Sequence, residues 1–277
     1  MALKLMYITN RPEVAQIAEA AGVDRIFVDL EYIGKAARQG GMDTVQNRHT
    51  VEDVRTMHSA LHSAELLVRV NPIHEATVDY PSSQEEIDAV ISAGAEIIML
   101  PFFHTAEEVR TFLRLVGRRA KTMLLFETPG SIEHLDEILA IPGIDETYVG
   151  LNDLSLGYGR KFMFELLADG TVERTCLRFK EAGLPFGFGG IAALGRGMLP
   201  AEYVIREHYK FGSTCAILSR SFCNAEKVGS LDEVRTIFET GIQEIRAFEQ
   251  VCAEHAAFFD DSEQELRRIV NEIASQK

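Results

Sequence analysis

Residues 122–153 read TMLLFETPGSIEHLDEILAIPGIDETYVGLND, and this stretch decides the fold class. It holds an apolar run at Thr122–Glu127, an amphipathic segment at Ile132–Ala140 and a second apolar run at Thr147–Gly150. Runs that are apolar almost throughout are typical of strands covered on both faces, which is the situation in a parallel sheet. The stretch therefore predicts one parallel strand–helix–strand unit.

The same alternation extends along the whole chain. The expected strands are Lys4–Thr9, Arg25–Leu30, Leu66–Asn71, Glu96–Pro101, Thr122–Glu127, Thr147–Gly150, Pro185–Gly189 and Thr214–Ser219. The helices expected between them are Pro12–Ala21, Val51–His62, Gln84–Ala93, Ala106–Val116, Ile132–Ala140, Val172–Ala182 and Glu202–Lys210. Eight such units predict a closed (β/α)8 TIM barrel. An open, doubly wound sheet is the alternative, but no GxGxxG motif follows the first strand, where Thr9–Pro12 stands instead.

The 277 residues fit one barrel domain spanning residues 1–277, since such barrels commonly contain roughly 250 residues. Two further helices are expected after the last strand, at Leu231–His255 and Ser262–Ser275. The first completes the eighth unit and the second is surplus. Residues 256–277 are therefore an expected C-terminal helical extension, packed either on a neighbouring subunit or across its own barrel.

The composition of the chain limits the classes of function that it can have. With 28 basic and 42 acidic residues the chain has a net charge of −14, which disfavours binding to nucleic acid. Its four cysteines form no CxxC pair, as expected for reduced thiols in the cytoplasm. Residues 1–10 do not resemble a signal peptide, and no window approaches the ~20 apolar residues of a membrane span. We expect a soluble cytoplasmic protein with no membrane partner.

In a TIM barrel the active site lies at the carboxyl ends of the strands. The polar residues at or just after those ends include Asp29, Glu31, Arg69, Asn71, Glu127, Asn152 and Asp153. Four carboxylates at one barrel mouth repel one another unless a cation neutralises them, and oxygen ligands favour Mg2+ or Mn2+. Glu127 and Asp153, from adjacent strands, are the expected metal ligands. The alternative for a single carboxylate is a helix cap or an arginine partner.

Arg69 is the expected substrate anchor. Its planar guanidinium suits the carboxylate of a 2-keto acid, while a metal ion would polarise the keto oxygen. The alternative is that Arg69 only neutralises the neighbouring carboxylates. The lysines of the expected strands, Lys4 and Lys121, stand at strand beginnings, away from the mouth. This position disfavours a Schiff-base mechanism and favours metal-assisted enolisation.

Several segments in this order resemble the HpcH/HpaI aldolase and citrate lyase family. They are Val28–Glu31, Val68–Asn71, Gly94–Pro101, Phe126–Thr128 followed by Ile132–Ile138, and Ile144–Ser155 with Gly157. The resemblance covers roughly residues 5–220. It implies a metal-dependent carbon–carbon lyase or aldolase that acts through an enolate of pyruvate or a related 2-keto acid, with an aldehyde or thioester as the other small-molecule partner.

On this resemblance Glu127 and Asp153 bind the metal and Arg69 binds the substrate. Asn71, Asn152 and Gly150 complete the expected substrate-binding set. The family also implies a homo-oligomer with exchanged terminal helices. The Asp29–Glu31 strand suggests a citryl- or malyl-type coenzyme A ester lyase as an alternative, and a non-catalytic ligand-binding or assembly barrel is an alternative of another class.

The chain departs from the family at the residue that serves in proton transfer. Tyr32 stands where the aldolases have a histidine, and Leu125 stands where they have a glutamine. Tyr32 itself, His49 and His74 are candidate replacements, since histidine titrates near neutrality. The expected catalytic set is Asp29, Glu31, Tyr32, His49 and Arg69.

A basic cluster accompanies these residues in the loop after the second strand. Lys35, Arg38 and Arg48 form it, and they either clamp a second anionic group or are solvated loop charges.

Overall fold

The strands close into an eight-stranded barrel in the structure, a computed structural model that describes residues 2–35, 48–254 and 259–276. The strands are β1 (Lys4–Ile8), β2 (Arg25–Asp29), β3 (Glu65–Arg69), β4 (Ile97–Leu100), β5 (Lys121–Phe126), β6 (Glu146–Val149), β7 (Phe186–Ile191) and β8 (Cys215–Leu218). Each pairs in parallel with the next, and β8 pairs with β1. The expected TIM barrel is confirmed.

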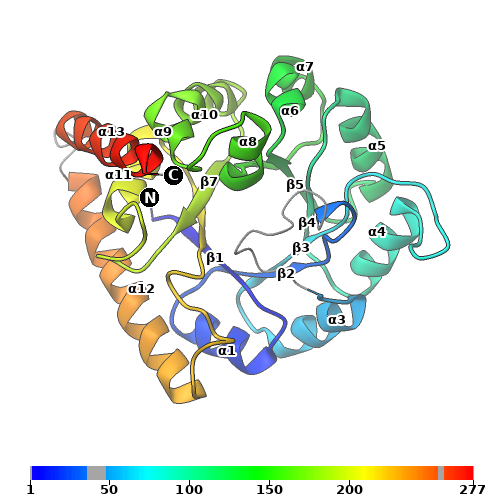
Figure 1. Ribbon diagram of the computed structural model, residues 1–277. Coiled ribbons are helices and arrows are strands. Elements are labelled where there is room, and N and C mark those ends of the chain that lie inside the picture. Colours follow the sequence, from blue (N-terminus) through cyan, green and yellow to red (C-terminus); the bar gives the residue numbers. More distant parts are fainter. Residues whose placement is uncertain (1, 36–47, 255–258, 277) are drawn as a thin grey trace.

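Helices surround this barrel on all sides (Figure 1). They are α1 (Pro12–Ala20), α3 (Val51–Ala60), α4 (Ser83–Ser92), α5 (Ala106–Val116), α6 (Pro129–Glu133), α7 (Leu135–Leu139), α8 (Leu151–Gly157), α9 (Glu165–Ala168), α10 (Thr171–Glu181), α11 (Ala201–Phe211), α12 (Leu231–Glu254) and α13 (Phe259–Ser275). The short helices α8 and α9 were not expected from the sequence. Asp153 therefore lies in the first turn of a helix rather than in a loop.

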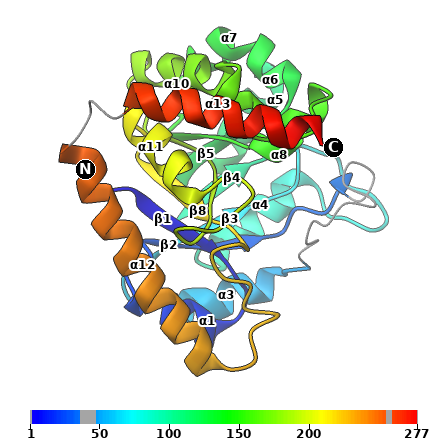
Figure 2. The same ribbon diagram turned by 60° about the vertical axis from the view of Figure 1, so that its left-hand side comes forward.

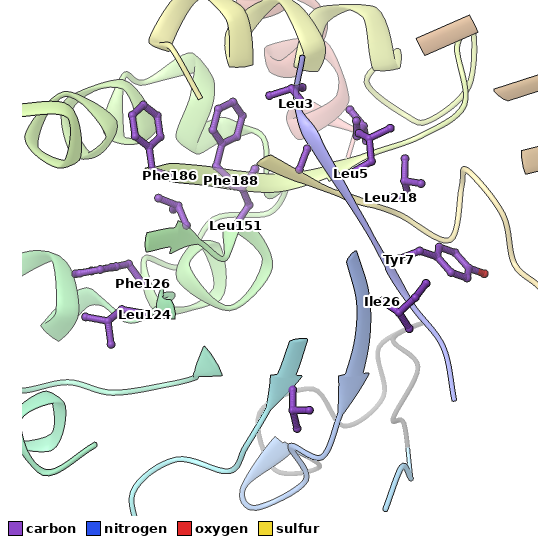
Figure 3. Close-up of a cluster of buried hydrophobic side chains, with 14 of the residues drawn as sticks. Leu3, Leu5, Tyr7, Ile26, Leu124, Phe126, Leu151, Phe186, Phe188 and Leu218 are labelled. Atoms are coloured by element: carbon purple, nitrogen blue, oxygen red, sulfur yellow. The ribbon is translucent and has the colours of Figure 1, made fainter. Parts of the chain in front are cut away.

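Alternate residues of each strand face opposite sides of the barrel wall, because strand side chains have a period of two. Phe186 and Phe188 of β7 point to the same side, towards the helices (Figure 3). The residues between such positions fill the barrel interior, namely Met6, Phe27, Leu67, Ile97, Met99, Met123, Leu125, Tyr148 and Cys215. Four of these side chains, Phe27, Met99, Leu125 and Tyr148, line the cavity at the mouth together with the polar residues of the strand ends.

An ion-pair network closes the opposite end of the barrel. The fully buried Arg25 of β2 donates two hydrogen bonds of 2.6 Å to Glu146 of β6. Lys4 and Lys121 lie 3.4 and 2.6 Å from Glu65. Both strand lysines are therefore where the sequence placed them, at the end away from the active site.

The two C-terminal helices pack on the barrel of their own chain. Helix α12 contacts α1 and α11, and α13 lies across α9 and α11 (Figure 2). The boundary of the extension and its exchange between subunits stay predictions. Within the described ranges, no helix is both long enough and apolar enough to cross a membrane.

Candidate active site

Glu127 follows β5 directly and is held by the neighbouring loop after β4. The backbone N–H of Phe102 donates to Glu127 Oε1 over 3.0 Å. Phe102 has a φ of 47°, a left-handed conformation that costs of order 1–3 kcal/mol in a residue other than glycine. Thr128 Oγ1 donates to the carbonyl oxygen of Phe103 over 2.6 Å, which ties the two loops together. The strained backbone at Phe102 thus helps to fix the Glu127 carboxylate.

Gly150 makes room for the same carboxylate. A Cβ atom at Gly150 would lie 2.7 Å from Glu127 Oε2 and 2.8 Å from Glu127 Cβ, closer than real contacts allow. Gly150 is also the residue that precedes α8, so the helix starts beside Glu127 and carries the buried Asp153 in its first turn. Glu127 and Asp153 line one cavity of about 470 Å3, which we call the active-site cavity.

These two carboxylates suit a hard divalent cation. Among the residues that the structure describes, no group of three or more His, Cys, Asp or Glu side chains could hold a metal ion. Mg2+ commonly uses only one or two protein carboxylates and completes its shell with water and substrate. Glu127 and Asp153 supply two carboxylate donors, and the missing Cβ of Gly150 leaves space beside Glu127. The residues present therefore fit the expected ion.

Arg69 and Asp29 form a bidentate pair at the other side of the active-site cavity. Arg69 Nε and Nη2 each donate to a carboxylate oxygen of Asp29 over 2.8 Å. Burial alone would raise the pKa of Asp29, but the charges of Arg69 and Lys35 outweigh burial and hold that pKa well below its usual range. Two of the five N–H groups of Arg69 are thus committed to Asp29, and the guanidinium still lines the cavity. Arg69 neutralises a carboxylate and is also in position to bind substrate.

Lys35, a loop lysine, reaches the mouth of the barrel although the strand lysines do not. Its Nζ lies 2.9 Å from Asp29 Oδ2 and 3.5 Å from Glu31 Oε2, and it lines the active-site cavity. The sequence placed Lys35 only in a basic loop cluster, because the path of the chain after β2 has no local signal. The amino group of Lys35 is held between the buried carboxylates of Asp29 and Glu31 rather than free to attack a carbonyl group, so the geometry does not favour a Schiff base on Lys35.

Glu31 is fully buried behind these cations. It lies 3.4 Å from Arg69 Nη1 and forms no wall of the active-site cavity. Two of the four expected carboxylates, Asp29 and Glu31, therefore face cations of the protein itself. The expected metal site therefore depends on Glu127 and Asp153.

His49 lies at the edge of the cavity with its ring fixed. The backbone N–H of Asp29 donates to His49 Nδ1 over 3.0 Å. An accepting Nδ1 carries no proton, so the neutral ring carries its proton on Nε2. Burial lowers the pKa of His49 from its ordinary value, more than the neighbouring Asp29 raises it. The geometry and the pKa shift both favour a neutral imidazole that can donate from Nε2.

Three other expected site residues lie outside the active-site cavity. Tyr32 is 42% exposed and lines a second cavity, and burial raises its pKa, whereas a proton donor near neutrality needs a lowered one. Asn71 Oδ1 accepts hydrogen bonds from the backbone N–H groups of Tyr32 and Ile33, so it supports this loop. His74 contacts the carbonyl oxygens of Pro72 and Pro81 within 2.8 Å and braces a loop.

The remaining expected residues are divided between the two cavities. Gly150 and Asn152 line the active-site cavity, and their role in substrate binding stays a prediction. Arg48 lines the second cavity, and Arg38 lies outside the described residues. The structure thus brings together Asp29, Lys35, His49, Arg69, Glu127, Gly150, Asn152 and Asp153. The contribution of Phe102 and the position of Lys35 were missed, since both depend on how distant loops meet.

Comparison with known proteins places this chain in a family. The chain is 24% identical over 213 residues to a 4-hydroxy-4-methyl-2-oxoglutarate aldolase of Chaetomium globosum, covering 65% of this chain and 72% of the relative. It is 26% identical over 211 residues to a hydroxypyruvate/pyruvate aldolase of Roseobacter denitrificans, covering 62% and 77%.

Solved structures agree on the fold. The crystal structure of an HpcH/HpaI aldolase from Desulfitobacterium hafniense matches with a TM-score of 0.59 and 18% identity, covering 88% of this chain and 93% of that one. The sequence model of the family described as HpcH/HpaI aldolase/citrate lyase matches residues 4–169. Because that match spans more than half of the chain, the resemblance and the expected class of enzyme, a carbon–carbon lyase or aldolase, are confirmed: the chain belongs to the HpcH/HpaI aldolase/citrate lyase family.

Proposed function

We propose that this protein is a divalent-metal-dependent aldolase that makes or breaks a carbon–carbon bond next to the carbonyl group of pyruvate or a related 2-keto acid. The observation that carries the proposal is one cavity at the carboxyl ends of the strands, lined by Glu127, Asp153 and Arg69. The names of the relatives, which are aldolases of oxoglutarate and pyruvate type, support the same class of substrate.

Glu127 and Asp153 would hold Mg2+ or Mn2+. When bound, the ion supplies the positive charge that stabilises an enolate. The protein prepares this position in advance, because Phe102 and Gly150 fix the Glu127 carboxylate before any ligand arrives. Preorganised charge of this kind costs no rearrangement during the reaction.

Arg69 would bind the carboxylate of the keto acid. Asp29 holds the guanidinium by two hydrogen bonds and so restricts its rotation. A fixed planar fork loses little entropy on binding a carboxylate. Gly150 and Asn152 line the cavity beside the metal ligands and would contact the bound keto acid.

His49 would act on the second substrate as a neutral hydrogen-bond donor. Its Nδ1 already accepts from Asp29, which leaves Nε2–H as the group that can face an oxygen. A neutral imidazole held in this way can polarise a carbonyl group and stabilise the alkoxide that forms from it. This role differs from the proton shuttle expected from the sequence.

The test is hydrogen–deuterium exchange of the pyruvate methyl group, followed by NMR with Mg2+ or Mn2+ and again with chelator. We expect exchange that depends on metal and is lost in Glu127→Gln and Asp153→Asn. Binding of Mn2+ to the same variants, followed by electron paramagnetic resonance, should weaken in parallel. Glu107→Gln, on an exposed carboxylate of α5, is the matched control and should keep both properties.

Absence of exchange in protein that binds Mn2+ would contradict the pyruvate aldolase and favour the coenzyme A ester lyase. Absence of exchange with thioesters as well would favour the non-catalytic barrel. Homo-oligomerisation and a cytoplasmic location, both expected from the sequence, stay predictions.

A further inference from the structure

A second cavity, which we call the outer cavity, lies beside the active-site cavity. Its volume is about 790 Å3, and its walls include Leu30, Tyr32, Arg48, Val51, Tyr80 and Ala89. It is larger than the active-site cavity, and its volume is typical of a small-molecule pocket. Lys35 and His49 line both cavities, so the two spaces meet at these side chains.

An aromatic pair dominates one wall of the outer cavity. The rings of Tyr32 and Tyr80 have centroids 5.2 Å apart and planes inclined by 38°. Leu30, Val51 and Ala89 add apolar surface. Such walls favour a planar apolar group, because aromatic side chains bury much area at a small loss of conformational freedom.

The backbone around these tyrosines is held in place. Asn71 accepts from the N–H groups of Tyr32 and Ile33, and its own side-chain amide donates to Glu86 over 2.7 Å. On the other side Thr77 Oγ1 accepts from the N–H of Tyr80 over 3.1 Å. The cavity therefore exists before a ligand binds, which lowers the entropy that binding costs.

Among the residues that the structure describes, Arg48 is the one cation at the outer cavity that has no partner. Glu86 accepts from Asn71, and Glu85 accepts from the backbone N–H of Ser82 in the cap of α4. Lys35 is paired with Asp29. Arg48 is exposed, and the described part of the chain offers it no hydrogen bond or ion pair. An anionic substituent on a ligand in this cavity would meet Arg48.

We propose that the outer cavity is the subsite for the acceptor substrate, and that this acceptor is an aldehyde or ketone with an aromatic group carrying an acidic substituent. The inference rests on the proposed function. In this arrangement the reacting carbonyl group lies at His49, the aromatic group lies against Tyr32 and Tyr80, and the acidic substituent reaches Arg48. If no ligand occupied the outer cavity, its apolar walls would face water next to the reacting groups.

The first experiment compares glycolaldehyde, benzaldehyde and 4-carboxybenzaldehyde as acceptors for pyruvate. We expect kcat/KM to rise in that order in the wild-type protein. Tyr32→Ala and Tyr80→Ala should each lower the ratio of kcat/KM for benzaldehyde to that for glycolaldehyde by about tenfold, a usual effect of losing an apolar wall. Arg48→Gln should lower the value for 4-carboxybenzaldehyde relative to benzaldehyde. Tyr158→Ala, on an exposed tyrosine that lines neither cavity, is the matched control.

The second measurement does not depend on turnover. Saturation-transfer NMR with 4-methylbenzoate, a non-reactive probe, should show binding to the wild-type protein that Tyr32→Ala and Arg48→Gln each weaken. If pyruvate exchanges its protons but aromatic acceptors have no advantage and the probe does not bind, the acceptor subsite is wrong and the proposed function stands. If pyruvate does not exchange, the probe still decides whether the outer cavity holds an aromatic acid, and absence of binding overturns the inference.

Discussion

The backbone N–H of Asp29 donates to Nδ1 of His49 over 3.0 Å, and this single bond fixes the protonation of the ring. The proton of the neutral imidazole must sit on Nε2, since Nδ1 accepts. Protonation of Nδ1 would place two N–H groups against each other, which agrees with the lowered pKa of His49. The residue therefore serves better as a neutral donor than as a base.

Removal of the His49 ring should slow the reaction with acceptor more than the reaction with pyruvate alone. We expect His49→Ala to lower kcat of aldol formation by about 100-fold, the usual value of one donor to a developing oxyanion. Because burial lowers the pKa of His49, loss of activity by its protonation should occur at a lower pH than for an ordinary histidine. Stopped-flow or NMR rates from pH 5 to 8 check this, and His58→Ala on α3 is the control. An acid limb centred above pH 6.5 that vanishes in His49→Ala would refute the neutral role.

Gly150→Ala should weaken metal binding without unfolding the barrel. The backbone of Gly150 has φ −83° and ψ 95°, which alanine accepts, so the main obstacle is the approach of Cβ to Glu127, with a lesser contact of 3.2 Å to Leu125 Cδ1. The displaced carboxylate should lower the affinity for Mn2+ by at least about tenfold, as changes next to metal ligands usually do. Titration with Mn2+ measures the affinity and circular dichroism checks the fold. Gly229→Ala, where the nearest atom is 3.7 Å away, should bind Mn2+ normally.

Arg69→Lys keeps the positive charge but removes the planar guanidinium and its paired N–H donors. We expect kcat/KM for pyruvate to fall by about 100-fold, because a lysine cannot hold Asp29 and a substrate carboxylate with one planar group. Steady-state kinetics with pyruvate varied measures this. Arg110→Lys, on an exposed arginine, should retain wild-type kinetics. Retention of kcat/KM in Arg69→Lys would show that Arg69 serves only to neutralise Asp29 and Glu31.

Arg25→Met tests the closed end of the barrel separately from the active site. Glu146 would lose both of its 2.6 Å hydrogen bonds and remain as a nearly buried charge. Loss of one partner of a buried ion pair costs about 3–5 kcal/mol. Urea unfolding should show this loss, whereas Arg55→Met, which removes an exposed pair with Glu52, should change stability by less than about 1 kcal/mol. A change below 1 kcal/mol in Arg25→Met would contradict the prediction.

Glu207 on α11 should make stability depend on pH. Burial raises its pKa from 4.5 to about 7, Lys210 opposes this rise, and Glu263 and Glu173 add to it. The folded protein therefore binds this proton more tightly than the unfolded chain does. The contribution of Glu207 to the free energy of unfolding is greatest below pH 4.5 and falls by about 3 kcal/mol as the pH rises to 7.

Glu207→Gln removes this dependence. The difference in free energy of unfolding, variant minus wild type, should increase between pH 4.5 and 7. Urea titrations at several pH values measure it, and Glu244→Gln on α12, an exposed carboxylate, gives the background. A difference that does not vary with pH would show that Glu207 is ionised in the folded protein across this range.

Sequence alone determined the barrel and the two metal-ligand candidates. Eight apolar runs separated by amphipathic segments have few other ways to bury both faces of a sheet. Once the strands are known, their carboxyl ends give Glu127, Asp153 and Arg69, because parallel strands all end at one mouth. The confirmed family membership followed from these same segments, whose order and spacing the sequence displays directly.

The tertiary structure decided which of these side chains face one another. Asp29 and Arg69 occupy paired positions of β2 and β3, and strands that are apolar almost throughout lack the alternating pattern that would reveal this register. Helix α8 begins at Leu151, and Gly150 before it supplies no side-chain cap, so the helical position of Asp153 was not visible in the sequence. Tyr32 and Lys35 are three residues apart, yet one lines only the outer cavity and the other reaches Asp29. Their positions depend on how loops from different strands pack, because the direction of a loop side chain is set by its distant neighbours and not by the residues beside it in the chain.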